Sequence, residues 1–472
     1  MNLNALFLSN MSNTRSDEYG GSLENLMRFN YEVIAAIRSA VGKDFALGMS
    51  IDADLLVDGA HNLDDMKIIA KKYADTGDID FYRVGLPPFS SLCMNYPLGS
   101  MVYAAAAIKE AVDVPVIALS RINDPVQADN ILADGHADII QMTRALICDP
   151  ELPLKAREGR LEEIRRCIAC NERCRSKPYP PAVPVRCALN PEASREGTMD
   201  IKPAETKKNV MVVGGGGAGL EAARVAALRG HKVTLYEQSG EMGGQLKIAA
   251  MAPGRSDFNE VPRYYSYQME LLGVDVKLNT RVDKEFVLKE NPDAVIIATG
   301  SLQYVPSIPG SDQPNVVEVR DVLEGKVEVG QKVVIMAYEH HNHALSTADY
   351  LLERDKDVEV LVGTLYAGAQ MDLLTLQGVY SIILSKGAKL TPLTEIEKIE
   401  GKTVTAYNVL SNKDYIIENV DTVVMSTLGK ADDDLYRSLK GQVKEIYGIG
   451  HCMAPRMLAD SIFDAAIVGR QV

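Results

Sequence analysis

The stretch NVMVVGGGGAGLEAARVAALRGHKVTLYE, residues 209–237, decides the fold of the C-terminal part of this chain. An apolar strand pattern leads into a glycine-rich loop, a helical pattern follows, and a second strand ends at Glu237. Gly214, Gly216 and Gly219 fit G-x-G-x-x-G, in which glycine permits a tight turn and the approach of a pyrophosphate to the helix N-terminus. The terminal acid is placed to hydrogen-bond a ribose hydroxyl. The stretch predicts a Rossmann-like domain that binds FAD or ADP; a glycine turn without a ligand is the alternative.

Two further loops contain small residues that leave their backbone open to a flavin, EMGGQL at 241–246 and ATG at 298–300. Each alone is typical of an ordinary turn. The candidate cofactor-binding residues of this domain are Gly214, Gly216, Gly217, Ala218, Gly219, Glu237, Gly244, Gln245, Ala298, Thr299 and Gly300.

A second strand, loop and helix pattern begins at Lys332, but its loop, AYEHHNH at 337–343, contains no glycine. A pyrophosphate cannot approach such a loop closely, so we expect a Rossmann-like domain that does not bind NAD(P)H. The three histidines are more typical of solvated or hydrogen-bonded side chains than of a metal site. The predicted boundaries are 207–325 plus 422–472 for the FAD- or ADP-binding domain and 326–421 for the inserted one.

The N-terminal part alternates short apolar strands with helical patterns. The strands are expected at 46–51, 79–84, 114–119 and 138–142, which predicts a parallel sheet over residues 1–165. Four such units are half of a (β/α)8 TIM barrel. Half a barrel exposes two strand edges, so we expect another kind of open sheet, a longer protein, or a partner chain or second copy that completes the barrel.

Four of the seven cysteines, Cys167, Cys170, Cys174 and Cys187, form the pattern C-x2-C-x3-C-x12-C. Three close cysteines and a distant fourth favour a [4Fe–4S] cluster, with zinc or unligated thiols as the alternatives. The surrounding segment, 166–206, is predicted to be a ligand-holding loop and linker because it is rich in proline: Pro178, Pro180, Pro181, Pro184 and Pro191. Nearby arginines either offset the charge of a cluster or are solvated: Arg165, Arg166, Arg173 and Arg175. The other cysteines, Cys93, Cys148 and Cys452, are expected to be buried apolar residues.

Composition narrows the classes of partner. The 472 residues carry a formal net charge of −14, which argues against nucleic acid and against an anionic membrane surface. No apolar run approaches the roughly 18 residues of a membrane span. We expect a soluble cytoplasmic protein.

Several segments together resemble one family. They are FLSNMSNTRSDEYGGSLENLMRF (7–29), LSRINDP (119–125), TRALICDPELPLKAREG (143–159), the four cysteines, the Gly214 loop and IYGIGHCMAPRMLADSIFDAA (446–466). The chain resembles the old-yellow-enzyme-like NADH:flavin oxidoreductases that carry an iron–sulfur cluster, of the trimethylamine dehydrogenase, histamine dehydrogenase and 2,4-dienoyl-CoA reductase type. The loop at 337–351 is closer to the amine dehydrogenases, and the cysteine spacing is closer to the reductases.

The resemblance implies an FMN-binding barrel, a cluster, and an FAD- or ADP-binding domain with an insertion. It places the FMN phosphate at Ser120, Arg121, Thr143 and Arg144, and it assigns no catalytic residue. Ser50 stands where the family has an arginine beside the flavin, His451 replaces a flavin-contacting aspartate, and the chain has no Trp. These departures argue against FMN binding by this chain alone and against a tertiary-amine substrate.

The sequence therefore predicts a flavin-dependent oxidoreductase. Electrons from a small-molecule substrate oxidised at FMN would pass through the cluster to a protein acceptor such as an electron-transfer flavoprotein. The alternatives are an NAD(P)H-dependent enoate reductase, a non-catalytic electron-transfer subunit completed by a partner chain, and an inactive fragment.

Overall fold

A computed structural model of the chain describes residues 3–57, 59–85, 92–175 and 184–472. It divides into two compact units, Met1–Leu146 and Ile147–Val472. Pro178, Pro180 and Pro181 lie outside the described residues.

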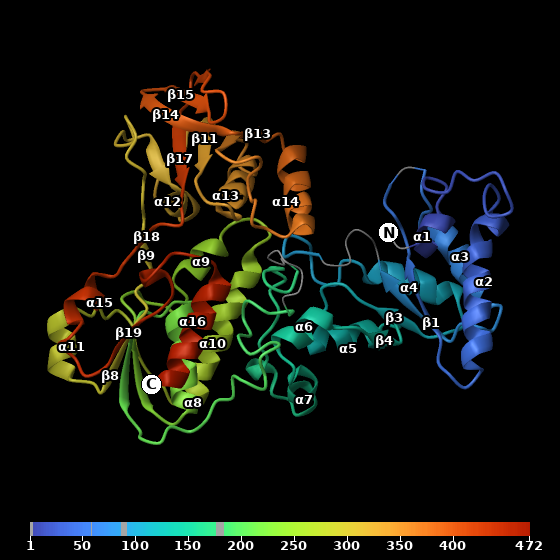
Figure 1. Ribbon diagram of the computed structural model, residues 1–472, viewed down its shortest axis with the longest axis horizontal. Helices are drawn as coiled ribbons and strands as arrows, with labels where there is room; N and C mark the ends of the chain where they lie inside the picture. The colour runs from blue at the N-terminus through green and yellow to red at the C-terminus, as the bar shows by residue number, and fades with distance from the viewer. Residues whose placement is uncertain (1–2, 58, 86–91, 176–183) are drawn as a thin grey trace. The chain divides into compact units, whose positions relative to one another are not determined.

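The first unit is built on a four-stranded parallel sheet in the order β1-β2-β3-β4 (Figure 1). Its strands are β1 (Gly48–Asp52), β2 (Phe81–Gly85), β3 (Val116–Ala118) and β4 (Ile139–Ile140), close to the four expected positions. Its helices are α1 (Leu3–Leu8), α2 (Leu23–Val41), α3 (Leu63–Ala74), α4 (Val102–Ala111), α5 (Pro125–Ala133) and α6 (Thr143–Cys148), the last of which crosses the boundary between the units.

Helix α2 begins and ends where the sequence predicts. The side chain of Ser22 accepts a hydrogen bond from the N–H of Asn25, which satisfies one of the unpaired donors of the first turn. Gly42, with φ of 78°, ends the helix by donating its N–H to the carbonyl of Arg38.

The two faces of this sheet differ in burial. Ile51, Tyr82, Val84, Val116 and Ala118 alternate onto the face that packs against the helices and are at most 4% exposed. The alternate positions, which include Ser50, Arg83, Ile117 and Ile139, are only partly buried or exposed. Parallel sheets are normally covered on both faces, so this uncovered face is the one that faces the interior in a complete barrel.

The second unit contains two further parallel sheets. The first has the order β19-β8-β5-β6-β7, that of a Rossmann-like domain. Its strands are β5 (Asn209–Val213), β6 (Lys232–Tyr236), β7 (Asp275–Lys277), β8 (Ala294–Ile297) and β19 (Ile446–Gly448). Its helices are α8 (Gly217–Leu228), α9 (Gln245–Ala249), α10 (Glu260–Leu271), α11 (Lys284–Glu290), α15 (Asp434–Leu439) and α16 (Leu458–Gln471). Helix α16 packs so closely on α8 that a Cβ on Gly469 would lie 2.7 Å from Val225.

The second sheet corrects the predicted limits of the inserted domain. Its order is β10-β17-β11-β12-β13, from β10 (Val316–Glu318), β11 (Lys332–Ala337), β12 (Asp357–Val362), β13 (Lys389–Pro392) and β17 (Thr422–Ser426). Strands β10 and β17 lie outside the expected 326–421, because β17 pairs with β11 and so belongs to this sheet rather than to the first.

The inserted sheet is covered on both faces. Helices α12 (Val319–Leu323), α13 (His343–Leu352) and α14 (Leu373–Ser385) pack on one face. An antiparallel sheet of β14 (Thr394–Glu400), β15 (Thr403–Asn408) and β16 (Asp414–Ile417) packs on the other. The short pair β9 (Ser301–Leu302) and β18 (Lys430–Ala431) joins the two chain segments that connect the domains.

The first unit ends at Leu146, whereas the sequence predicted that it would extend to residue 165. Helix α7 (Leu152–Arg157) and the residues around it group with the second unit. The physical reason is the buried carboxylate of Asp149, which accepts hydrogen bonds from the Lys155 ammonium at 2.8 Å and from the N–H of Arg165 at 2.9 Å. These bonds fix α7 against the start of the cysteine segment.

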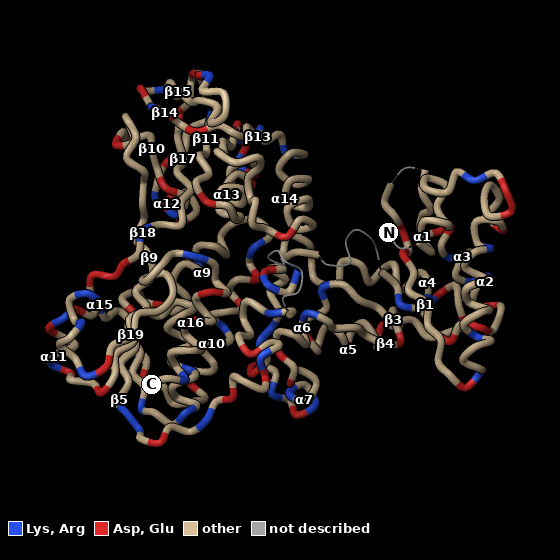
Figure 2. The backbone as a smooth tube through the Cα atoms, in the orientation of Figure 1, with Lys and Arg blue, Asp and Glu red and all other residues tan. Residues whose placement is uncertain are grey.

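Acidic and basic residues alternate along the chain in both units (Figure 2). Within the described ranges, no helix is both long enough and apolar enough to span a bilayer.

A buried ion pair within α8 is linked to α10 by a tyrosine hydroxyl in the first Rossmann-like domain. The Arg224 guanidinium donates to both carboxylate oxygens of Glu221, at 2.7 and 2.9 Å, and the hydroxyl of Tyr265 donates to the same carboxylate at 3.1 Å. We expect Arg224→Met to lower the free energy of unfolding by about 3–5 kcal/mol, because it leaves a buried carboxylate unpaired. Urea unfolding measures this loss. The double variant Arg224→Met/Glu221→Gln should recover part of it, and a loss below about 1 kcal/mol for the single variant would contradict the assignment.

Candidate functional site

The glycine loop joins β5 to α8 as the sequence predicts. The N–H of Gly214 donates to the carbonyl of Tyr236 at 2.8 Å, and the N–H of Gly215 donates to the carboxylate of Glu237 at 2.7 Å. Glu237 directly follows β6 and is only 8% exposed. Its hydrogen bond with Gly215 places the carboxylate directly beside the loop. This is the arrangement in which an acid contacts the ribose of a nucleotide whose pyrophosphate lies at the helix N-terminus.

Glycine is required at the three positions of the loop motif for different structural reasons. A Cβ on Gly214 would lie 2.3 Å from the carbonyl oxygen of Ala298, and one on Gly219 would lie 1.9 Å from that of Gly214. These two glycines permit close packing of backbone on backbone. A Cβ on Gly216, by contrast, would meet nothing within 4 Å. The protein therefore leaves open space at Gly216, where the helix N-terminus faces outward, and this space fits a pyrophosphate.

The other two predicted loops lie next to the glycine loop. Gly243 donates its N–H to the carbonyl of Gly215 at 2.9 Å, and a Cβ on Gly244 would lie 3.4 Å from the Cα of Gly216. The Gln245 amide donates to the hydroxyl of Ser301 at 2.9 Å, directly after the 298–300 loop. The structure thus brings together all eleven residues predicted from the sequence. It adds Gly450, whose Cβ would lie 2.9 Å from that of Ala218, so that His451 follows at the same helix end.

The backbone of the cysteine segment has an unusual conformation. Ala169, Asn171 and Arg173 all have positive φ, of 49°, 57° and 69°, although none of them is glycine. Left-handed residues that alternate with right-handed ones turn successive backbone N–H groups toward one side and form an anion-binding nest, a feature of many iron–sulfur sites. Such strain is concentrated at functional sites. No sequence signal predicted these three conformations.

Two of the four cysteine sulfurs accept hydrogen bonds from backbone N–H groups. The N–H of Ala169 donates to the sulfur of Cys167 at 3.4 Å, and the N–H of Leu189 donates to that of Cys187 at 3.4 Å. Burial raises the pKa of Cys170, and the negative charges of Glu172 and of the other three cysteines raise it further, so the four thiols lie within electrostatic reach of one another. The donor set and the backbone donors fit a thiolate-bound cluster.

No group of three or more His, Cys, Asp or Glu side chains in the described ranges is arranged to hold a single metal ion.

The cysteine segment is anchored to both domains of the second unit. The Asn171 amide donates to the hydroxyl of Thr375 on α14 at 2.9 Å. The carboxylate of Glu172 accepts the N–H of Ala459 at 3.2 Å at the start of α16, and Arg173 forms an ion pair with Asp460 on the same helix. Burial raises the pKa of Glu172 to about 7. The segment is therefore held rigidly between the first turns of α14 and α16.

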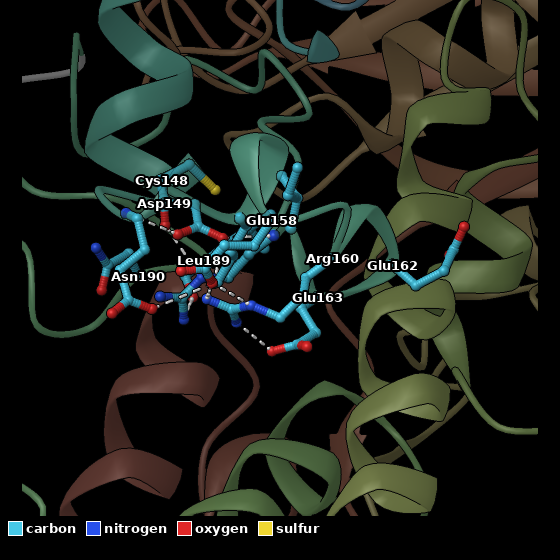
Figure 3. Close-up of polar contacts among 12 residues, drawn as sticks. Cys148, Asp149, Glu158, Arg160, Glu162, Glu163, Leu189 and Asn190 are labelled. Carbon is cyan, nitrogen blue, oxygen red and sulfur yellow. Dashed lines mark hydrogen bonds and ion pairs between the residues drawn. The ribbon is translucent and has the colours of Figure 1, made fainter. Parts of the chain in front are cut away.

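Cys148 was expected to be an apolar core residue, but the structure gives it a second role. It is fully buried, and a hydrogen bond with its thiol lowers the pKa of Cys187 to about 6. Figure 3 shows Cys148 and Asp149 beside Leu189 and Asn190. The Arg165 guanidinium links these two chain segments, because it donates to the carbonyls of Cys148 at 3.1 Å and Leu189 at 3.0 Å. Arg165 therefore supports the loop, whereas Arg175 is exposed.

The predicted FMN residues lie in the first unit, after neighbouring strands. Ser120 and Arg121 follow β3, and Thr143 and Arg144 follow β4, so both pairs lie at the same edge of the parallel sheet, where TIM-barrel phosphate sites occur. Ser120 has φ of 94°, a backbone conformation that glycine adopts more readily than other residues. Arg121 and Arg144 donate to backbone carbonyls of Met94 and Leu92, at 2.9 and 2.7 Å.

Arg83 is a charge that sequence reasoning missed. It lies on β2 opposite Ser50 of β1, and its guanidinium donates to the Ser50 hydroxyl at 2.9 Å and to the Gln141 amide oxygen at 2.6 Å. Arg83 thus places a positive charge beside Ser50 from the neighbouring strand. The register of the two strands, residue 50 opposite residue 83, is the signal that would have found it.

In the loop of the inserted domain, a glutamate of the loop itself accepts the backbone N–H groups at the start of the next helix. Glu339 is 3% exposed, and its carboxylate accepts the backbone N–H groups of His341 at 2.5 Å and Ala344 at 2.9 Å. The hydroxyl of Ser426 lies 3.3 Å from the same carboxylate. Of the three histidines of this loop, His341 is buried, His340 is partly buried and His343 is exposed.

Comparison with known proteins identifies the family. The model of the NADH:flavin oxidoreductase / NADH oxidase family matches residues 3–163, and that of the pyridine nucleotide-disulphide oxidoreductases matches residues 208–450. The chain belongs to the NADH:flavin oxidoreductase / NADH oxidase family. It is an α/β flavin oxidoreductase with a barrel-type FMN domain and Rossmann-like domains of the FAD- and NAD(P)-binding type.

Individual relatives cover nearly the whole chain. It is 34% identical to a metal reductase of Desulforamulus reducens and 35% identical to an N,N-dimethylglycine/sarcosine dehydrogenase of Chromohalobacter salexigens, over 97% of this chain and 73% of each relative. A solved 2-naphthoyl-CoA reductase, 34% identical, superimposes with a TM-score of 0.91 over 100% of this chain and 72% of its own. Histamine dehydrogenase from Rhizobium sp. 4-9, 26% identical, also reaches 0.91, over 99% and 72%.

Proposed function

We propose that this chain is an iron–sulfur flavoprotein oxidoreductase that passes electrons from a small-molecule substrate to a protein acceptor, such as an electron-transfer flavoprotein. The observation that carries the proposal is the cysteine segment. Three left-handed non-glycine residues shape its backbone, and the N–H groups of Ala169 and Leu189 donate to the sulfurs of Cys167 and Cys187, both at 3.4 Å. Strain of this kind persists only where the surrounding structure enforces it, and the anchors on α14 and α16 supply that enforcement.

Three cofactor sites fit the residues present. Cys167, Cys170, Cys174 and Cys187 would hold a [4Fe–4S] cluster. FAD or ADP would lie over Gly216 with its ribose at Glu237, and the FMN phosphate would lie at the sheet edge formed by Ser120, Arg121, Thr143 and Arg144. A flavin exchanges electron pairs and a cluster exchanges single electrons, so the two together convert one kind of transfer into the other. The protein's part is to hold each group and to supply charge through Arg83 and Arg121.

The uncovered face of the first sheet supports completion of the barrel by further polypeptide. Arg83 and Ser50 project onto that face, so the added strands would enclose the charge beside the FMN. A longer protein, a partner chain or a second copy of this chain would supply them. The catalytic residues would then come at least partly from the added strands.

The second candidate is an NAD(P)H-dependent reductase. Relatives named cinnamate reductase and NADH oxidase, 30% and 39% identical, favour it. The loop at Glu339 disfavours it, because the helix end that would receive the pyrophosphate already holds a carboxylate.

Anaerobic mixing of the flavin-loaded protein with NADH separates the two candidates. We expect flavin absorbance to stay unchanged over minutes with NADH or NADPH, and to fall when dithionite is added as a control. Bleaching by either nucleotide at a rate near ordinary turnover, about 1–1000 per second, would contradict our proposal and support the reductase.

A further inference from the structure

We propose that Glu339 is an internal substitute for a dinucleotide phosphate and seals the inserted domain against NAD(P)H. This inference deepens the proposed function, since it names the residue that excludes a nicotinamide donor or acceptor from this domain. It is carried by the hydrogen bonds and burial of the Glu339 carboxylate.

The position of Glu339 corresponds to a phosphate site. Strand β11 leads through a loop into helix α13, just as β5 leads through the glycine loop into α8. In such units the pyrophosphate accepts backbone N–H groups at the helix N-terminus and is favoured there by the helix dipole. Glu339 makes the same kind of contact from within the chain, because both of its oxygens accept such N–H groups, at His341 and at Ala344 in the first turn.

The N-terminus of α8 and the N-terminus of α13 therefore differ in whether the phosphate position is open or filled. At α8, Glu237 accepts the N–H of Gly215 from the side, and the space over Gly216 stays open. At α13, the N-cap residue Asn342 makes no side-chain cap, and the carboxylate of Glu339 takes its place. Ser426, at the end of the neighbouring strand β17, lies beside the same carboxylate and holds it in position.

An external anion competes poorly with this arrangement. The carboxylate is covalently tethered, so it meets the helix end at a high effective concentration, and it is 3% exposed. Two anions cannot share the same N–H groups without repulsion. The loop cannot easily move away, because the carbonyl of His340 accepts the N–H of Gln370 at 2.9 Å. The domain thus keeps the dinucleotide fold while its phosphate position is filled.

The test is rescue by an external phosphate. Glu339→Ala in the full chain removes the acceptor of two buried N–H groups, and we expect its melting temperature to fall by about 5 °C. With saturating ADP present to fill the glycine loop, inorganic pyrophosphate at millimolar concentration should recover about half of this loss. The wild-type protein should show no shift under the same conditions.

A matched control is Asp372→Ala, which removes the N-cap of α14 in the same domain. We expect it to lose stability without recovery by pyrophosphate. Glu339→Gln keeps one acceptor oxygen and removes the charge. If the alanine variant does not fold, this variant should bind pyrophosphate at least tenfold more tightly than the wild type in equilibrium dialysis. An equal response of wild type and variant, or no response of either variant, would overturn the inference. Melting does not depend on electron transfer, so this result stands or falls separately from the proposed function.

Discussion

Cys170→Ala is expected to remove bound iron and inorganic sulfide and the charge-transfer absorbance near ~400 nm from anaerobically purified protein. Cys170 lies between Ala169 and Asn171, two of the left-handed residues that shape the nest, so its thiolate enters the site from the most constrained part of the loop. Loss of one ligand of four leaves an iron open to solvent. The three remaining thiolates would then repel one another in a partly buried site, which disfavours a stable cluster.

Cys452→Ala is the matched control for this variant. Cys452 is also buried, and its thiol donates to the carbonyls of Ile297 and Ile449, both at 3.1 Å, away from the four cysteines. We expect its iron and sulfide content to equal that of the wild type. An unchanged visible spectrum in Cys170→Ala, with an equal iron content, would refute the cluster.

Gly216→Val is expected to weaken binding of FAD and ADP by roughly 10- to 100-fold while the protein still folds. The reason is the open space over Gly216, where φ is −77° and a Cβ meets no protein atom within 4 Å. A branched side chain is tolerated by the protein there and occupies the space of the pyrophosphate. Isothermal titration of ADP, with the melting temperature as a check on folding, measures both effects.

Two other glycines control this experiment. Gly197→Val adds a side chain at an exposed position that is equally open, and it should leave both ADP affinity and stability unchanged. Gly219→Val should prevent folding, because its Cβ would lie 1.9 Å from the carbonyl oxygen of Gly214. Full ADP affinity in Gly216→Val would show that the nucleotide lies elsewhere.

The sequence predicted the elements that depend on local pattern. The G-x-G-x-x-G spacing placed β5 and α8, and apolar runs located the four strands of the first unit, because buried strands leave a clear local signal in the sequence. Ser22 and Gly42 marked the ends of α2 for the same local reason. The family resemblance was confirmed by the comparisons.

Pairing between distant strands was not predictable in the same way. Strand β17 was expected in the wrong sheet, since nothing in its own residues states that it pairs with β11, about ninety positions earlier. Arg83 and Glu339 were missed for a related reason: their roles arise from partners on other strands or loops. The left-handed backbone at Ala169, Asn171 and Arg173 could not be predicted, because none of these residues is a glycine.

The most direct test of this account is the iron, acid-labile sulfide and flavin content of the protein purified without oxygen. We predict about four iron and four sulfide per chain, together with bound FAD or ADP. Material that lacks iron and nucleotide, although it is folded and its cysteines are reduced, would contradict the account.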